Sequence, residues 1–332
     1  MTGMSSDQVK KTSLVVIVPT WNRPKDLAIC LKALQSQTIL PDRVIIAGKE
    51  NDKALLDWHN NYRVAPGYSS VEVVLSPAGA NVVQQQNKAL AQTTEDIVAL
   101  TDDDAEPNPN WIQQLLHHFQ DPSVGGVGGR DWQPIERGNR NPVGMLSWYG
   151  RLIGNHHLGF GPARQVHVLK GVNCAYRGAE LRSFRFDDRM RGSGTVINWE
   201  LAISFAFIRN GYRLIYDPAI SVQHHIADRK DGDTNQRGRF EAQSYFDNTY
   251  NEVLAIYEHL SPIRRIAYRI WSELIGTIGN PGMVQLVRSW SSRREYLKAS
   301  AWSRYRTALS ARRNAVADLR NRSTNPINIH DQ

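Results

Sequence analysis

Short apolar runs recur through the first third of the chain, and each is followed by polar or turn-forming residues. The runs occupy residues 14–18, 44–47, 71–75 and 97–101. They are rich in β-branched residues and too short for helices, which is typical of buried strands. Because three of the four have no polar face, we expect strands covered on both sides, as in a parallel sheet.

Between these runs, apolar residues repeat at helical spacing. Leu27, Leu31 and Leu34 predict a helix after the first run, and residues 54–62 and 81–91 predict two more. This alternation predicts an α/β fold with a mostly parallel central sheet and helices on both faces, Rossmann-like in its order. Ligands of such sheets bind outside the carboxyl ends of the strands.

The pattern is looser beyond residue 123. The glycine-rich run 125–129 lacks the lysine and hydroxyl residue of a phosphate loop, and we interpret it as a tight edge strand lying close to neighbouring backbone. The other expected elements are a strand at 166–169, a helix at 199–210 and two short strands at 212–216 and 220–222.

The composition is that of a folded globular protein, with 332 residues of which 41% are hydrophobic. Two cysteines, Cys30 and Cys174, are too few for a disulfide framework or a zinc site. The polar start of the chain and the lack of a long uncharged apolar run predict a cytoplasmic protein without a spanning helix.

Positive charge is concentrated at the carboxyl end. Residues 261–332 hold 13 Lys and Arg against 4 Asp and Glu, and the remaining 27 bases and 28 acids nearly cancel. We expect a flexible start at 1–12, a main domain at 13–228 with halves at 13–122 and 123–228, and a basic, mainly helical extension at 229–332. A nearly neutral main domain offers no continuous track for nucleic acid.

The extension combines helical apolar spacing with arginines and tryptophans. Two interpretations are open. A basic amphipathic helix can lie on an anionic membrane surface as a peripheral anchor, or the same stripe can pack on the main sheet or a second subunit. The apolar stripe consists of Ile266, Ile270, Trp271, Leu274 and Ile278, and the added tryptophans are Trp290 and Trp302.

The run at 97–101 ends in three consecutive carboxylates, Asp102, Asp103 and Asp104. One aspartate would be enough to cap the helix expected after Pro109, whereas three adjacent carboxylates repel each other unless a cation lies among them. Oxygen-rich sites with open positions suit Mg²⁺ or Mn²⁺, which also bind the phosphates of a substrate. The triplet therefore predicts binding of a metal and a diphosphate.

Four segments in this order resemble the inverting family 2 glycosyltransferases, which have the A-type glycosyltransferase fold. They are residues 18–23, 101–104 and 171–177, and the stretch 191–224. The resemblance implies a nucleotide-diphosphate sugar donor, Mn²⁺ or Mg²⁺, and a glycan or lipid-linked acceptor. Ala47, Gly48 and Lys49 depart from the family, whose members often have an acidic pair here that contacts uracil.

The resemblance also implies roles for individual residues. Glu200 is the expected catalytic base, six residues after Gly194, and Asp104, Asp102 and His224 are the expected metal ligands, with His224 preferred over His225. The expected donor-binding residues are Pro19, Thr20, Asn22, Arg23, Asn87, Asp102, Asp103, Asn173 and Arg177. We also consider His156 and His157 as lining an acceptor cleft or lying in a surface loop.

Two other functions share some of these features. A sugar nucleotidyltransferase would carry a glycine-rich turn after the first strand, and residues 19–22 contain no glycine. A degenerate transferase acting as a nucleotide-sugar or glycan binding module would have lost its carboxylates, whereas Asp102, Asp104 and Glu200 are all present.

Overall fold

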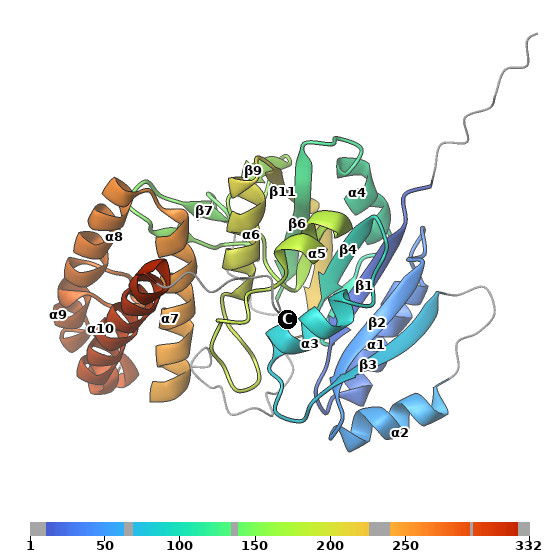
Figure 1. Cartoon of the computed structure of the whole chain (residues 1–332), viewed down its shortest axis with the longest axis horizontal. Helices are drawn as coiled ribbons and strands as arrows, with labels where there is room; N and C mark the ends of the chain where they lie inside the picture. Colours follow the sequence, from blue (N-terminus) through green and yellow to red (C-terminus); the bar gives the residue numbers. More distant parts are fainter. Residues whose placement is uncertain (1–10, 63–68, 134–138, 226–239, 293–294, 325–332) are drawn as a thin grey trace, which may run out of the picture.

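A computed structural model describes residues 11–62, 69–133, 139–225, 240–292 and 295–324 (Figure 1). Within these ranges one nine-stranded sheet lies between two layers of helices. Its strands are β1 (Leu14–Pro19), β2 (Arg43–Lys49), β3 (Ser70–Ser76), β4 (Ile97–Thr101), β5 (Ala105–Pro107), β6 (Val124–Trp132), β9 (Arg164–Val166), β10 (Asn173–Arg177) and β11 (Arg213–His224). A small separate hairpin pairs β7 (Met145–Leu146) with β8 (Leu152–Ile153).

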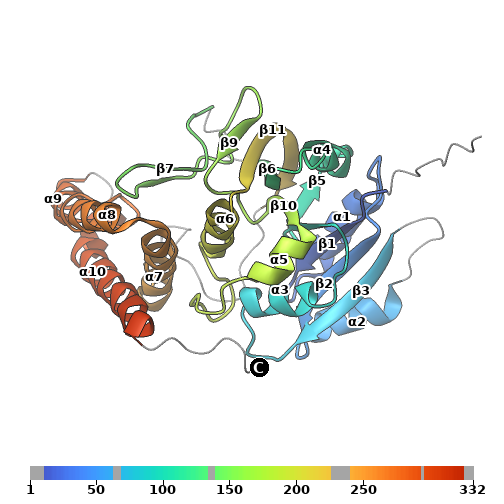
Figure 2. The ribbon, with the colours of Figure 1, turned by 45° about the horizontal axis from the view of Figure 1, so that its top comes forward.

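The helices cover both faces of the sheet and extend beyond one side of it (Figure 2). Those of the main domain are α1 (Pro24–Gln35), α2 (Lys53–Asn61), α3 (Val82–Leu90), α4 (Trp111–His118), α5 (Gly178–Phe184) and α6 (Trp199–Arg209). Those that follow it are α7 (Ala242–His259), α8 (Pro262–Leu274), α9 (Met283–Trp290) and α10 (Glu295–Thr324). Among the described residues, none of these helices is long and apolar enough to cross a membrane.

The predicted fold class is confirmed. Strands β3, β2, β1 and β4 are parallel neighbours in this order, and the sheet continues through β10, β6, β11 and β5, of which β10 and β5 are antiparallel to their neighbours. Side chains alternate between two cores, so that Val15 and Ile17 face α3 while Val16 and Val18 face α1. Cys30 and Cys174 are buried thiols.

Three predictions about the second half were wrong. The glycine run 125–129 belongs to β6, which lies inside the sheet between β10 and β11 rather than at its edge. Its glycines are explained by this position, because a Cβ on Gly129 would lie 1.7 Å from the carbonyl oxygen of Ile220. The expected strands 212–216 and 220–222 are one strand, β11, with an irregularity between Asp217 and Ser221, and the strand expected at 166–169 ends at Val166 as β9.

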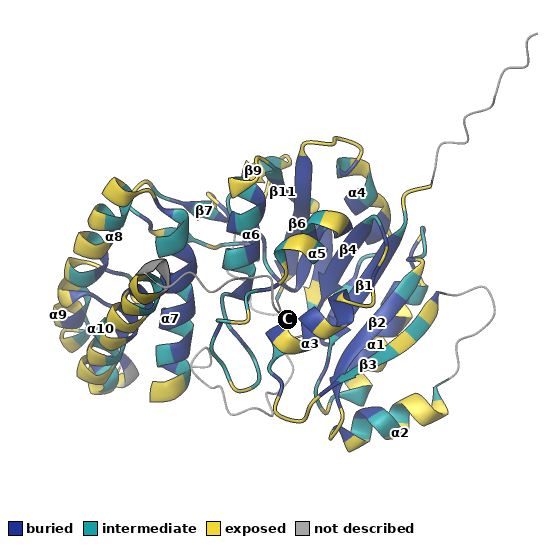
Figure 3. Cartoon of the chain, in the orientation of Figure 1, coloured by how far each residue is buried: buried dark blue, intermediate teal, exposed yellow. Residues whose placement is uncertain are grey.

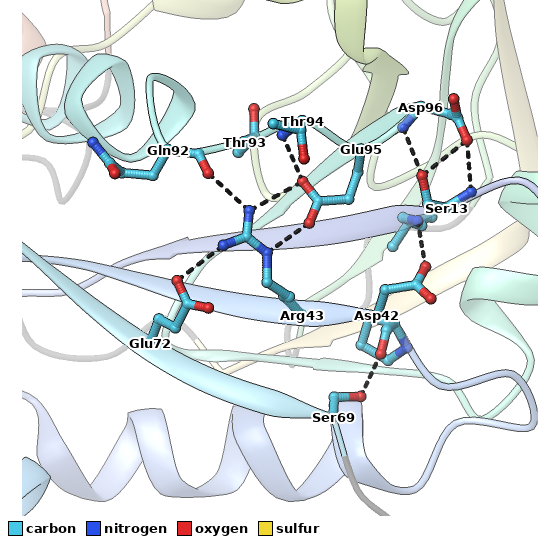
Figure 4. Close-up of polar contacts among 12 residues, drawn as sticks. Ser13, Asp42, Arg43, Ser69, Glu72, Gln92, Thr93, Thr94, Glu95 and Asp96 are labelled. Carbon is cyan, nitrogen blue, oxygen red and sulfur yellow. Dashed lines mark hydrogen bonds and ion pairs between the residues drawn. The ribbon is translucent and has the colours of Figure 1, made fainter.

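Ion pairs join the strands at the amino end of the sheet (Figure 4). The guanidinium of Arg43, at the start of β2, donates Nε to Glu95 Oε1 at 2.6 Å and Nη1 to Glu72 Oε2 at 2.9 Å. Nearby, Ser13 donates both its backbone N–H and its hydroxyl to Asp96. This edge is therefore tied together by side chains, and the opposite edge carries the sequence motifs.

The helical extension is confirmed as helical, but it is not separate from the main domain. Tyr250 and Leu254 of α7 and Ala311 and Ala315 of α10 belong to the same hydrophobic cluster as the residues of α6. Figure 3 shows buried residues along α7 and exposed residues on the outer sides of the helices beyond it. The expected flexible start and the boundary at residue 228 fall mostly outside the described residues.

Candidate active site

The carboxyl ends of β1, β4, β6 and β11 meet at one edge of the sheet. Ile17 of β1 pairs with Leu100 of β4, and the chain then turns so that Ala105 of β5 pairs with His224 of β11. The backbone N–H of His225 donates to the carbonyl of Asp104 at 2.9 Å, which holds the end of β11 against the carboxylate turn. Parallel strands therefore deliver residues about 120 positions apart to one place.

Asp102, Asp104 and His224 form a cluster whose potential ligand atoms all lie within 4.8 Å of one another. His224 Nε2 is 3.4 Å from Asp104 Oδ1. The imidazole of the next residue, His225, points away from the cluster, because successive side chains along an extended chain alternate in direction. His225 Nε2 contacts Glu106 Oε2 at 2.7 Å on the exposed side.

Two residues that the sequence did not single out complete this cluster. Asp131, near the end of β6, is fully buried, and its Oδ2 accepts from Lys170 Nζ at 2.5 Å and lies 3.6 Å from His224 Nδ1. Asp131 Oδ1 and His224 Nδ1 are buried without a hydrogen-bond partner among the described residues. If β6 had been predicted as an inner strand parallel to β4, its carboxyl end would have been expected beside the carboxylate turn, and Asp131 would have been identified.

The electrostatics of the cluster favour a bound cation. Burial lowers the pKa of His224, but the carboxylates of Asp104 and Asp131 outweigh burial and raise it to about 9. Burial and the neighbouring Asp104 raise the pKa of Asp102. Crowded carboxylates are costly without a cation, and the ligand atoms of Asp102, Asp104 and His224 lie close enough together to share one. Two oxygens and one imidazole nitrogen fit a divalent metal such as Mn²⁺ or Mg²⁺.

Asp103 points to the other side of the turn. Its carboxylate accepts from Thr20 Oγ1 at 2.7 Å and from Arg23 Nη1 at 3.0 Å, while Arg23 Nη1 is also 3.5 Å from Asp104 Oδ2. Burial raises the pKa of Asp103 to about 7, although Arg23 and Thr20 oppose this rise. Asp103 thus joins the turn after β1 to the carboxylate turn after β4.

The turn after β1 is held in a specific shape. Pro19 ends the strand, the backbone N–H of Thr20 donates to the carbonyl of Ala47, and Asn22 adopts the left-handed conformation with φ of 54°. The backbone N–H of Asn22 donates to Asp52 Oδ2 at 2.6 Å. The structure therefore brings Thr20 and Arg23 to the carboxylates, with Pro19 and Asn22 shaping the loop that carries them.

Lys49 ends β2, at the position where the resemblance noted in the sequence implies an acidic pair. Its side chain is buried, and its Nζ lies 4.7 Å from the centre of the Trp21 ring. A cation over an aromatic face is an attractive contact, strongest when both groups are shielded from water. The chain therefore presents a lysine and an indole here in place of carboxylates.

Glu200 lies in the first turn of α6, after Asn198 in the left-handed conformation. Burial raises the pKa of Glu200 to about 7. Lys170 lowers this pKa and Asp102 raises it, so both charges lie near enough to act on the carboxyl group. A half-buried carboxyl with a pKa near neutrality is suited to accepting a proton.

Three of the expected donor-binding residues have structural partners. The Asn87 side chain donates to the Phe186 carbonyl and to Asp188. Asn173 is fully buried, where its Oδ1 accepts from the Trp111 indole at 2.8 Å and its amide donates to two backbone carbonyls. Arg177 pairs with Ile97 at the opposite end of the sheet, so it does not reach the cluster.

Arg177 and His156 both serve to satisfy backbone groups. The Arg177 guanidinium donates to the carbonyls of Phe119, Asp121 and Val124. His156 lies neither in a cleft nor in a surface loop, because it is buried with Nε2 at 2.9 Å from the Val168 carbonyl. Burial accordingly lowers the pKa of His156 to about 4.

Comparison with known proteins agrees with this geometry. The family model "Glycosyl transferase family 2" matches residues 15–181, which is half of the chain and includes the carboxylate turn. The chain belongs to this family. The Staphylococcus aureus TarS fragment 1–349, crystallised with UDP-GlcNAc, has a similar fold with a TM-score of 0.55 at 13% identity, over 93% of this chain and 92% of that one.

Curated proteins match this chain at higher identity, some of them over only part of their length. The pre-mycofactocin glycosyltransferase of Mycobacterium tuberculosis is 30% identical over 167 residues, which are 47% of this chain and 33% of that protein. The O-antigen chain rhamnosyltransferase WbaN of Salmonella anatum is 26% identical, covering 71% of this chain and 70% of its own length. The glucosyl-dolichyl phosphate glucuronosyltransferase of Haloferax volcanii is 23% identical over 65% of this chain and 69% of its own length.

Proposed function

We propose that this chain is an inverting, metal-dependent glycosyltransferase that moves a sugar from a nucleotide diphosphate to an acceptor hydroxyl. The observation that carries the proposal is the cluster of Asp102, Asp104 and His224 beside Glu200, at the sheet edge where α/β proteins bind ligands. Family membership and the named activities of the relatives support it.

Asp104, Asp102 and His224 would hold Mn²⁺ or Mg²⁺, and the imidazole favours Mn²⁺ because Mg²⁺ prefers oxygen ligands. When bound, the ion neutralises charge on the departing nucleoside diphosphate. Asp131 and Lys170 support the site. Lys170 and His224 keep the pKa of Asp131 far below its ordinary value despite burial, so Asp131 stays ionised, and its charge 3.6 Å from Nδ1 favours this orientation of His224.

Glu200 would accept the proton of the acceptor hydroxyl while that oxygen attacks the anomeric carbon from the side opposite the diphosphate. One bond forms between the acceptor oxygen and the sugar, and the bond to the diphosphate breaks with its electrons. A single in-line displacement of this kind inverts the anomeric configuration. Buried surroundings keep Glu200 basic enough to take the proton near neutral pH.

We propose a lipid-linked or glycan acceptor. The dolichyl phosphate and O-antigen named in two relatives support this class. Lys49, over the Trp21 ring, stands where the resemblance implies carboxylates that contact uracil, so a panel of donors with different bases is the direct test.

The central experiment replaces Asp104 with Asn and follows release of nucleoside diphosphate from a panel of nucleotide sugars with Mn²⁺. We expect a loss of turnover on the order of 10²-fold or more, together with loss of Mn²⁺ binding measured by calorimetry. Asp57→Asn, at an exposed position of α2, is the matched control and should keep both properties. Full turnover in excess chelator would contradict the metal assignment.

A further inference from the structure

Helices α8 and α9 and the link between them carry many exposed residues (Figure 3), and a large share of these are apolar. Ile263 is 73% exposed, Ile266 is 62% exposed and Ile278 is 60% exposed. Scattered exposed side chains of this size are normal, but a continuous set on adjacent elements marks an interaction surface. We define the apolar face as Ile263, Ile266, Ile270, Leu274, Ile275, Ile278, Met283, Val284, Val287 and Trp290, all of which are exposed.

The apolar face is regular, not the result of loose packing. On α8 its members recur at intervals of three or four residues, so they share one side of the helix. The opposite side is bound to the protein, with Tyr268 and Ser272 buried and the Trp271 ring 5.2 Å from that of Tyr149. Trp271 therefore lies on the inner side of α8, whereas the sequence grouped it with Ile266 and Ile270 in one apolar stripe.

Arginines hold α8 in this orientation. Arg264 donates to the carbonyls of Ser147 and Trp148, and Arg265 donates to the carbonyls of Tyr257 and Glu258. Two of the three arginines of α8 thus point toward the protein while its isoleucines face the surroundings, whereas a solvated surface helix keeps its apolar side chains on the inner side. Such an arrangement is stable when the outer side also meets an apolar medium.

The charges around the apolar face indicate what kind of surface covers it. Arg269 on α8 and Arg288 on α9 are exposed beside the apolar face, and Lys298, Arg306 and Arg313 are exposed on α10. A second copy of this chain, docked by twofold symmetry, would bring the same positive charges together. An anionic bilayer instead offers hydrocarbon to the isoleucines, phosphate to the arginines and an interfacial zone to the indole of Trp290.

We propose that α8, residues 275–278 and α9 lie in the interface of an anionic membrane, with the apolar face inserted below the headgroups. The same helices approach the candidate site through α7. Asn251 of α7 binds the backbone carbonyls of Arg191 and Ile197, and the carbonyl of Asn248 accepts from Asn198, so α7 supports the segment that leads into Glu200. Insertion would bring the whole chain to the membrane that carries lipid-linked acceptors, a consequence that rests on the proposed function, whereas membrane binding itself does not.

The test is flotation of the full chain with vesicles of phosphatidylcholine alone and with vesicles of equal phosphatidylcholine and phosphatidylglycerol. We expect binding to the anionic vesicles that weakens as salt is raised. The double variant Ile266→Ser, Ile270→Ser should lower the partition coefficient on the order of 10²-fold. The control Ile29→Ser, Phe160→Ser removes two similarly exposed apolar side chains elsewhere and should bind as the parent does.

A second variant separates charge from insertion. Arg269→Gln with Arg288→Gln should reduce binding to anionic vesicles and leave any weak binding to phosphatidylcholine unchanged. Binding that is unaffected by the isoleucine variant would overturn the proposal, as would absence of binding to anionic vesicles at low salt. Sedimentation equilibrium of the lipid-free chain tests the alternative, a second copy of this chain. A dimer that dissociates in the isoleucine variant would assign the apolar face to that second copy. Because no turnover is measured, an inactive transferase would still report on this proposal.

Discussion

Burial raises the pKa of two carboxyl groups at the site to about 7, and their surroundings give them different roles. Asp103 accepts from Thr20 and Arg23, so it links the turns that follow β1 and β4. Glu200 begins α6 beside the metal-type cluster, with Lys170 and Asp102 acting on its charge. Burial thus raises the pKa of both groups, but Asp103 has a structural role, whereas we propose that Glu200 transfers a proton.

Glu200→Gln should keep the fold and the binding of donor and Mn²⁺ but lower turnover by a factor on the order of 10²–10⁴, because the amide cannot accept the proton. Single-turnover kinetics and calorimetry with the donor separate the two effects. Glu180→Gln, also in the first turn of a helix, is the control and should leave turnover near that of the parent. Loss of donor affinity at unchanged turnover would make Glu200 a binding residue.

Turnover should depend on pH through Glu200. The base acts only when ionised, and its pKa is raised to about 7, so the ionised fraction falls about tenfold per pH unit below 7. We expect turnover at saturating donor and metal to rise with pH up to about 7 and then level off. The residual rate of Glu200→Gln should lack this rise, and an identical profile in that variant would assign the titration to another group.

At the scale of elements, β6 and β11 decide the geometry of the site. Their parallel pairing brings Asp131 beside His224, and an irregularity between Asp217 and Ser221 shifts the register on the way. Glycine makes the close approach of the strands feasible, because Gly129 faces the carbonyl of Ile220 with no space for a side chain.

Gly129→Ala should therefore lower the free energy of unfolding by about 3 kcal/mol, since the strands must separate to admit the methyl group. It should also weaken Mn²⁺ binding, because Asp131 follows two residues later. Urea denaturation and calorimetry measure these effects. Gly79→Ala, where no atom lies within 4 Å of the added Cβ, is the control and should change neither quantity appreciably.

Substitutions at the amino ends of the strands should lower stability without affecting catalysis. Arg43→Met removes the partner of the largely buried Glu95 carboxylate, whose pKa is held below its ordinary value in part by Arg43 although burial opposes this. We expect a loss of about 2–4 kcal/mol in unfolding free energy with turnover of the remaining folded protein unchanged. Lys11→Met, in the exposed pair with Asp42, should cost less than about 1 kcal/mol.

At the scale of the whole molecule, the main domain and the helices after it share one hydrophobic core. Val253 and Ile256 of α7 and Ala311 of α10 are buried in the cluster that also contains Phe205 of α6 and Leu214 of β11. A core shared in this way couples the stability of its elements, and it supports the base-bearing segment at the same time.

Hydrogen exchange in increasing urea tests this coupling. We expect the slowest amides of α7 and of β6 to exchange with the same opening free energy and the same urea dependence, as in one cooperative unit. Amides of the surface helix α9 are the internal reference and should exchange earlier. If every amide of α7 exchanges with an opening free energy well below that of β6, the helices form a separate unit, as the predicted boundary at residue 228 implies.

The sequence by itself determined the fold class and the metal-type carboxylates, because short apolar runs and a triplet of adjacent aspartates are local signals. It also favoured His224 and Glu200 through the family resemblance, and the structure brings His224 to the carboxylates. Tertiary structure alone decided the rest. Asp131 reached the site because β6 lies inside the sheet, and Arg177 was carried away because β10 runs antiparallel to β4. Helical spacing shows that a helix has an apolar side, but neighbouring elements decide which side they cover, so only the fold exposed the isoleucines of α8.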